Sequence, residues 1–474
     1  MSGFNHGIGT VESPTSIIAI KVDGITPCYV GTAPINLSEE KNVNKPVLCN
    51  TYAEAVQAFG YVKDFENFTL CEAIDAHFSK FGVGPIVLIN VLDPSIHKTT
   101  VVQESVPIGE NKTIIIKKIG ILKETLKLEP ELEHVSEFDD DGFLNIIITA
   151  TEGIPEGNNI KITYDCLDTT LVEADDIIGG IDQKTGKNKG LECIEDVFPI
   201  TRLVPSLILA PKFSTDTVVA AVMETKASLI NGHFKAVALV DIDTKKVKKY
   251  TDVPQTKELN NINSTYLDVS YPKVALEELQ YHLSTQRACV IQSMASESQG
   301  IPYQSPSNSN IKCDRTCLSD DTDVLLSINQ ANYLNGNGIT TAINWIGGWR
   351  IWGNRTSCYP ANTDAKDAFL AARMMFNFLN NAIITNFWNK VDKPTNSTLI
   401  KTFKDSINIW LNGLQAAGMI IGGRIEFREE DNPLTSLLDG KVKFKIYFSP
   451  ALPMEYALFD CEIDTNYYSN LFAA

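Results

Sequence analysis

Long apolar runs and basic clusters are missing from this 474-residue chain, and histidine is scarce. No apolar run approaches the roughly 18 residues that a membrane span needs, and the N-terminus has no basic segment followed by an apolar one. We therefore expect no membrane insertion and a chain that stays in the compartment where it is made. Because the net charge is −17 and no basic stripe with interleaved aromatics occurs, we expect no nucleic-acid binding.

Metal-ligand and disulfide patterns are missing as well. The ten cysteines are scattered, and several lie in apolar stretches, as reduced buried thiols do. Cys313 and Cys317 have no second Cys or His pair nearby to complete a zinc site. The aspartate runs at 139–141 and 320–323 lack the ligand spacing of a calcium loop and are typical of solvated turns. We expect no metal site and no disulfide framework.

The residues of a catalytic site are also hard to find. None of the six histidines falls beside an acidic or nucleophilic motif. His77, next to Phe78 in a helical pattern, is more typical of a buried core residue. The Gly-Lys-Asn-Lys-Gly stretch at 186–190 lacks the spacing of a phosphate loop and the strand before it. We expect no catalytic residue, no cofactor and a structural role. The alternative is an α/β enzyme that binds a small ligand in a crevice at its strand ends.

Short apolar strands alternate with helical patterns through much of the chain. The patterns predict strands at 27–32, 85–92, 206–210, 236–240 and 288–292, and helices at 51–60, 69–82, 216–230 and 272–286. This alternation predicts a largely parallel sheet.

Residues 101–180 differ from the rest in charge. They hold 17 acidic and 6 basic residues, and thus −11 of the net −17. Short strand patterns near 113–116, 144–148 and 160–164 are separated by turn-forming Asp, Gly and Asn residues. This block is expected to be a small all-β insertion that faces solvent.

The stretch from Asn344 to Pro450 contains all five tryptophans. Two amphipathic patterns, from Asp364 and after Pro394, predict a helical hairpin packed on a sheet. An alternating strand is expected at 441–448, with its lysines on one face. We interpret this region as the principal core, with the tryptophans in it.

The two ends of the chain carry weaker signals. Residues 1–24 have no helical period, so they fit either a flexible end, which composition favours, or an extended arm that pairs with something else. Residues 456–464 are expected to form a strand.

The segment Asn344 to Thr356, Asn-Trp-Ile-Gly-Gly-Trp-Arg-Ile-Trp-Gly-Asn-Arg-Thr, resembles the signature of tail sheath proteins of contractile phage tails and R-type bacteriocins. The similarity continues at 359–360, 410–414, 422–427 and 439–442, and toward the front at 31–34, 44–48 and 180–186. Its signature and core residues are Trp345, Gly348, Trp349, Trp352, Gly353, Asn354, Arg355, Thr356 and Trp410.

The resemblance implies a multidomain α/β and α+β fold, in which an alternating α/β sheath core carries a small all-β insertion and extended terminal arms. The expected parts are an N-terminal arm (1–24), the first part of the core (25–100), the outward-facing acidic insertion (101–180), the second part of the core (181–320), a C-terminal sheath domain of helical hairpin plus sheet (321–454) and a C-terminal arm (455–474).

The resemblance also implies a function. A sheath subunit polymerises helically around an inner tube through exchanged terminal strands, and it contracts without nucleotide to drive the tube through a target envelope. Implied partners are further copies of the chain, the inner tail tube protein, and baseplate and tail terminator proteins. The implied location is a phage tail or bacteriocin particle assembled in the cytoplasm of a bacterial host. A soluble adaptor of the same particle is a less favoured alternative.

Two sets of residues follow from this reading. The expected inter-subunit arm residues are Gly9, Thr10, Val11, Phe459, Cys461 and Ile463. The candidates for contacts to the tube or a neighbour are Lys441, Lys443, Lys445, Arg424 and Arg428.

Overall fold

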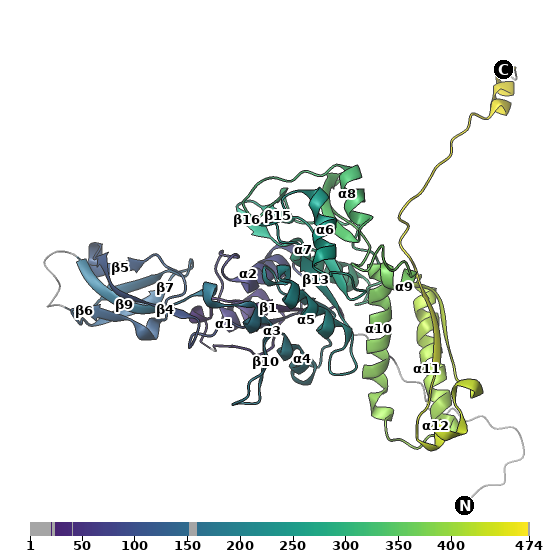
Figure 1. The fold of residues 1–474 in the computed structure, drawn as a ribbon, viewed down its shortest axis with the longest axis horizontal. Helices are drawn as coiled ribbons and strands as arrows, with labels where there is room; N and C mark the ends of the chain where they lie inside the picture. The colour runs from purple at the N-terminus through teal and green to yellow at the C-terminus, as the bar shows by residue number, and fades with distance from the viewer. Residues whose placement is uncertain (1–19, 21–23, 40, 151–158, 473–474) are drawn as a thin grey trace, which may run out of the picture.

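The computed structural model describes residue 20 and residues 24–39, 41–150 and 159–472. Its body is a mixed α/β unit built on one large sheet, with a small β-rich part at one end and a pair of long helices at the other (Figure 1). The predicted fold class is confirmed. No helix in these residues is long and apolar enough to cross a membrane.

The central sheet has eight strands in the order β19-β18-β14-β13-β12-β1-β3-β2. Its six inner strands run parallel, and its two edge strands are antiparallel to their neighbours. The bounds are β1 Pro27–Gly31, β2 Val47–Cys49, β3 Ile86–Asn90, β12 Leu207–Leu209, β13 Val237–Asp241, β14 Leu267–Ser270, β18 Ile339–Trp345 and β19 Gly348–Trp352. The inner strands β1, β3, β12 and β13 are buried throughout, as their unbroken apolar sequences predict.

Helices cover this sheet on both faces. They are α1 Tyr52–Phe59, α2 Thr69–Ile74, which continues as a π-helix through Phe81, α4 Ile194–Thr201, α5 Thr217–Ser228, α6 Val253–Leu259, α7 Leu283–Glu297 and α8 Ile328–Asn335. The predicted helix at 51–60 is confirmed, because the Thr51 side chain accepts a hydrogen bond from the Glu54 amide and Gly60 ends the helix at φ 74°.

The prediction for residues 272–292 is wrong. The segment forms the hairpin β15 Lys273–Leu276 and β16 Leu279–Tyr281, which pairs with β17 Arg315–Cys317, and then α7. The apolar run that predicted a strand at 288–292 lies inside α7, whose first ten residues are all buried. A helix buried on every side has no amphipathic period, so its sequence looks like that of a buried strand.

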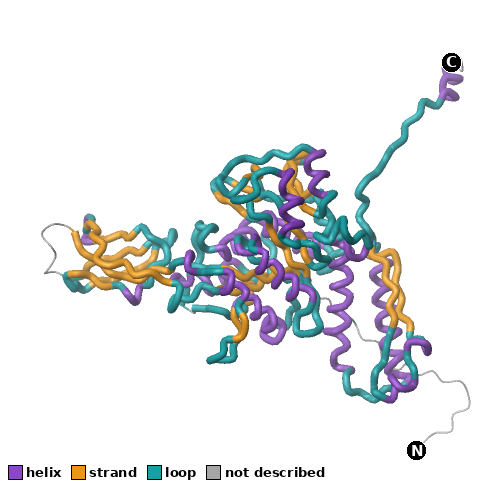
Figure 2. Tube along the Cα trace, in the orientation of Figure 1, coloured by secondary structure: helices purple, strands orange, loops and turns teal. Residues whose placement is uncertain are grey.

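The acidic insertion has its own hydrophobic core and projects from the body (Figures 1 and 2). Two three-stranded sheets, β4-β9-β6 and β5-β8-β7, enclose this core. The strands are β4 Lys98–Pro107, β5 Thr113–Ile116, β6 Lys127–Glu129, β7 His134–Phe138, β8 Leu144–Ile148 and β9 Asn159–Leu167. The short helix α3, Ala174–Ile178, packs instead on the body, where Ile177 is buried in the main core. A two-residue pair, β10 Gly180–Ile181 with β11 Asn188–Lys189, follows.

The C-terminal part contains α9 Ala365–Ala368, α10 Leu370–Phe387 and α11 Ser397–Ala416, followed by the antiparallel pair β20 Ile420–Glu426 and β21 Lys445–Pro450, with α12 Leu434–Leu438 between the two strands. It has a separate, smaller core. The expectation that this region is the principal core is wrong, because the largest cluster surrounds the eight-stranded sheet. Since β18 and β19 belong to that sheet, the predicted boundary at 320 falls inside the region that builds it.

Two strand predictions near the C-terminus are also wrong. β21 begins at Lys445 and not at Lys441. The reason is that the Asn432 side chain is hydrogen-bonded to both backbone groups of Lys443. It donates to the Lys443 oxygen at 2.9 Å and accepts from the Lys443 nitrogen at 2.7 Å. The expected strand at 456–464 is extended and exposed without a pairing strand (Figure 2), and it leads to a short 3-10 helix, Thr465–Phe472. A strand needs a partner, and the described part of the single chain provides none there.

Candidate assembly surface

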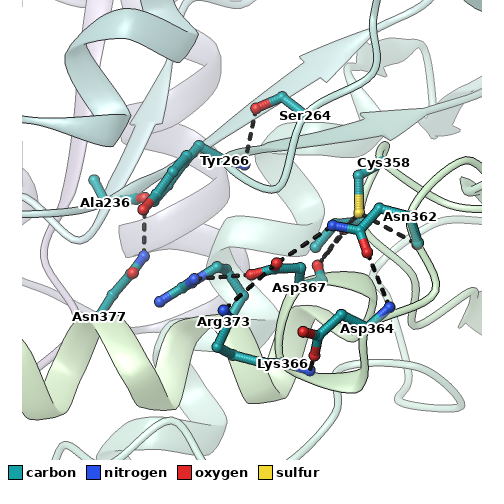
Figure 3. Close-up of polar contacts among 11 residues, drawn as sticks. Ala236, Ser264, Tyr266, Cys358, Asn362, Asp364, Lys366, Asp367, Arg373 and Asn377 are labelled. Atoms are coloured by element: carbon teal, nitrogen blue, oxygen red, sulfur yellow. Dashed lines mark hydrogen bonds and ion pairs between the residues drawn. The ribbon is translucent and has the colours of Figure 1, made fainter.

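The C-terminal unit is attached to the sheet body through α10 (Figure 3). Asn377 donates to the backbone oxygen of Ala236 at 3.0 Å. One turn later, Asn381 donates to the oxygen of Lys235 at 2.8 Å and accepts from its amide at 3.0 Å. Residues four apart share one face of a helix. These two amides therefore fix α10 against the segment that leads into β13.

A buried arginine completes this joint. Arg373 donates to the Asp367 carboxylate at 3.1 Å, and its guanidinium lies 5.4 Å from the centre of the Tyr266 ring (Figure 3). The backbone oxygen of Asp367 accepts from the Thr356 hydroxyl at 2.6 Å. Thr356, the last residue of the signature segment, is thus tied to the start of the helical unit.

The signature segment forms the hairpin of β18 and β19. Trp345 pairs with Gly348 across its turn and is 56% exposed, so it is not a core residue of the single chain. Trp349 is half-buried and donates from its indole nitrogen to the Asp314 oxygen at 2.9 Å. Trp352 and Trp410 are half-buried as well. The prediction that all tryptophans lie in the core is therefore wrong, since Trp388 is also exposed.

The end of this hairpin requires glycine. Gly353 has φ 140°, and a side chain there would meet the Thr340 backbone at 2.9 Å. Gly348 is exposed and Asn354 is half-buried. The outer edge of β19 is covered by residues 308–311, since Ile351 donates to Ser309 and Ile311 donates to Trp349. This edge of the large sheet is therefore protected from further strand pairing.

Arg355 connects the signature to the C-terminal arm. Its Nε donates to Glu455 Oε1 at 2.7 Å, and a second nitrogen contacts the other carboxylate oxygen. Its guanidinium lies 3.7 Å from the centre of the Phe369 ring and 4.6 Å from that of Tyr359. A bidentate, stacked arginine is a rigid anchor. Glu455 marks the point from which the C-terminal arm leaves the body.

The pair β20–β21 is a two-stranded sheet with two outer edges. Within the residues that the structure describes, these two strands pair only with each other, and α11 packs against β20. No strand covers either outer edge, although the Ile425 amide of β20 donates to the Asn408 side chain at 3.0 Å. Free edges of this kind are templates for an additional strand.

The candidate contact residues surround this sheet, and most already have a partner in their own chain. Arg424 pairs with Glu426 at 2.7 Å, and Arg428 pairs with Glu430 at 2.7 Å and also with Asp431. Lys443 lies 3.2 Å from Asp431, and Lys441 lies 3.7 Å from Asp439. Lys445 lies over the Tyr447 ring. Exposed pairs of this kind contribute about 0–1 kcal/mol each, so exchanging them for pairs with a neighbour would cost little.

The predicted arm residues fall into two groups. Gly9, Thr10 and Val11 lie outside the described residues. Phe459, Cys461 and Ile463 are exposed and have no regular structure; Phe459 is 85% exposed and Ile463 is 75% exposed. Ile20 packs against the small C-terminal core.

Sequence reasoning missed Glu455, Asn377 and Asn381. The asparagines gave no signal, because both lie on the side of the predicted helix away from its apolar face through Phe376, Leu379 and Ile383. For Glu455 there was none, since its partner lies a hundred residues earlier.

Two solved structures of contractile-system sheaths have a similar fold. The sheath complex of the extracellular contractile injection system PVC in its contracted state superposes with a TM-score of 0.59 at 13% identity, covering 98% of this chain and 99% of that one. The contracted helical sheath of the anti-feeding prophage superposes with a TM-score of 0.58 at 13% identity, covering 97% and 99%.

The chain is also similar in sequence to phage tail sheath proteins. Residues 363–464 match the family described as the phage tail sheath C-terminal domain. The tail sheath protein of Burkholderia phage BcepMu is 26% identical over 99% of both chains. The tail sheath protein of Escherichia phage P2 is 26% identical over 65% of this chain and 76% of its own. The predicted resemblance to phage tail sheath proteins is confirmed.

Proposed function

We propose that this chain is the structural subunit of a contractile tail sheath. The observation that carries the proposal is the end-to-end similarity to the BcepMu tail sheath protein, which covers 99% of both chains. The sheath fold and the open β20–β21 sheet support it. The role is structural and not enzymatic.

Subunits are joined by exchange of their terminal arms. The C-terminal arm of one copy adds as a strand to an open edge of β20–β21 in another, and the N-terminal arm does the same at a second edge. Residues 455–463 span up to about 30 Å when extended, which exceeds the length of the seven-residue β20. Strand addition would also bury the exposed apolar side chains of the arm, such as Phe459 and Ile463.

Contraction follows from this connectivity. Arms that remain paired let the compact bodies rotate and shift past one another without separating. Each subunit then has two packings of different free energy, and the extended sheath persists as a kinetic trap until it is triggered. No nucleotide takes part.

The remaining partners are the inner tail tube, the baseplate and the tail terminator. The charged residues around β20–β21, namely Lys441, Lys443, Lys445, Arg424 and Arg428, contact the tube or a neighbouring subunit. The particle is assembled in the host cytoplasm, and the sheath itself neither enters a membrane nor binds nucleic acid.

Two substitutions in the C-terminal arm test strand exchange. Phe459→Asp combined with Ile463→Asp places two carboxylates where the arm must be buried, so the concentration needed for polymerisation should rise about tenfold or more. Sedimentation of the polymer measures this, with circular dichroism to verify folding. Ile115→Asp, a change at an exposed apolar residue of the insertion, is the matched control. Polymerisation of the arm variant at the wild-type concentration would contradict strand exchange.

A further inference from the structure

A second feature of the molecule lies far from the β20–β21 sheet. A cavity of about 310 Å³ opens outside the carboxyl ends of β12 and β13. It lies beside the point where the strand order of the sheet reverses, between β1 and β12. Open α/β sheets bind ligands at such points, and small-ligand pockets begin at about 300 Å³. The lining residues used below are Glu66, Lys212, Asp216, Asp243, Lys273 and His282.

Lys273 is the unusual residue of this cavity. It is 8% exposed, yet within the described residues its ammonium group makes no hydrogen bond and no ion pair. Lysines with so little exposed surface are uncommon, and Lys273 is one of the residues that line the cavity. Its charge helps to lower the pKa of Glu66 and of Glu72 from a distance. Glu66 itself is engaged by Lys245 at 2.7 Å, and Glu72 by His282 at 2.7 Å.

Lys212 supplies a second cationic group without a carboxylate partner. Its Nζ donates to the backbone oxygen of Glu66 at 2.8 Å, and that acceptor is uncharged. Burial, and then the neighbouring Lys245 and Lys273, lower the pKa of Lys212, although nearby acids oppose this. Its backbone has φ 71°, a strained value for a residue other than glycine, and strain of this kind gathers at functional sites.

The other groups of the cavity are already used. His282 accepts from the Lys212 amide at its Nε2, and its Nδ1 lies 2.7 Å from the Glu72 carboxylate. Asp216 caps α5 by accepting from the Val218 amide at 2.8 Å. Asp243 pairs with Lys246 at 3.2 Å. Lys212 and Lys273 are therefore the lining lysines without an ion pair in the described residues, while the Asp216 carboxylate has only backbone donors and the charges of the whole lining balance.

We propose that this cavity binds a small oxyanion such as phosphate, held between the ammonium groups of Lys212 and Lys273. The anion would supply Lys273 with the partner it lacks. It would also connect the loop after β12 to β15 and stabilise the sheet body. The inference is independent of the sheath function, because no residue of the arms or of β20–β21 takes part.

Isothermal titration of the full chain with inorganic phosphate tests this proposal. We expect saturable binding with one phosphate per chain, and no binding of chloride at matched ionic strength. Lys273→Gln should weaken phosphate binding by about tenfold to a hundredfold, because a charge-assisted hydrogen bond is lost. Lys184→Gln, a change at an exposed lysine of the 182–187 turn, should bind phosphate like the wild type.

Thermal unfolding distinguishes stabilisation by bound phosphate from a change in stability that comes only from the loss of a lysine charge. Phosphate should raise the Tm of the wild type and of Lys184→Gln, but not that of Lys273→Gln. If Lys273→Gln does not fold, Lys212→Met serves in its place, because Lys212 is only half-buried. The proposal is overturned if the wild type binds no phosphate, or if the lysine variants of the cavity bind phosphate as tightly as the wild type.

Discussion

At the scale of single residues, Arg355 has the clearest role. It belongs to the signature segment, but its side chain forms an ion pair with Glu455, near the C-terminal end of the chain. Two aromatic rings flank the guanidinium and limit its motion. The signature is thus the anchor of the C-terminal arm as well as a piece of the large sheet.

His77 predicts how stability depends on pH. It lies fully buried between the Tyr29 hydroxyl, 2.7 Å from Nε2, and Gln292 Oε1, 2.8 Å from Nδ1. Burial lowers the pKa of His77 to about 3 from the ordinary 6.5. Between these pH values the unfolded chain binds a proton that the folded chain does not, so stability is lost as the pH falls from about 6.5 to about 3. The prediction of a core histidine is confirmed.

Thermal unfolding measured from above pH 7 down to pH 4 tests this role. The wild type should lose stability steadily below pH 6.5, and His77→Gln should show a smaller slope over that range. Above pH 7 the two curves should run parallel, which serves as the internal control. Equal slopes below pH 6.5 would show that His77 does not cause the loss of stability at low pH.

At the scale of elements, the joint between α10 and the sheet body determines whether the C-terminal unit moves with the body. Asn377→Ala combined with Asn381→Ala removes three hydrogen bonds and leaves buried backbone groups of 235–236 unpaired. Leaving such groups unpaired costs about 1–3 kcal/mol each. We expect the helical unit to loosen while the eight-stranded sheet stays intact.

Hydrogen exchange measures this loosening. Amides of α10 and α11 should exchange faster in the double variant, whereas those of β1, β12 and β13 should stay protected. Asn380→Ala on the same helix makes none of these bonds to 235–236 and is the matched control. An unchanged exchange pattern in the double variant would show that the joint does not depend on these amides.

The elements also show what the sequence could predict. Apolar runs correctly predicted the four inner strands β1, β3, β12 and β13, but the sequence analysis missed β14 and β18. The capping residues of α1 were also recognised from the sequence. Residues 272–292 were not predicted correctly, because burial on every side removes the helical period of α7. The segment expected to be a strand at 456–464 has no pairing strand among the described residues. Among the site residues, the signature segment was visible in the sequence, but the Arg355–Glu455 contact required the fold.

At the scale of the whole molecule, the acidic insertion and the proposed assembly surface lie far apart. The insertion, which carries most of the negative charge, projects from one end of the body, and the β20–β21 sheet lies at the other end (Figure 1). Like charges in a helical polymer repel, so placing the acidic block away from the proposed contact region limits that repulsion. The body lies between them, and in the proposed assembly the arms supply the connections.

The most direct test of arm exchange is negative-stain electron microscopy of the purified full chain beside a variant that lacks residues 1–20. We predict long helical polymers for the full chain, and folded single subunits for the truncated variant. Wild-type polymers formed by the truncated variant, or isolated subunits under all conditions for the full chain, would contradict the account.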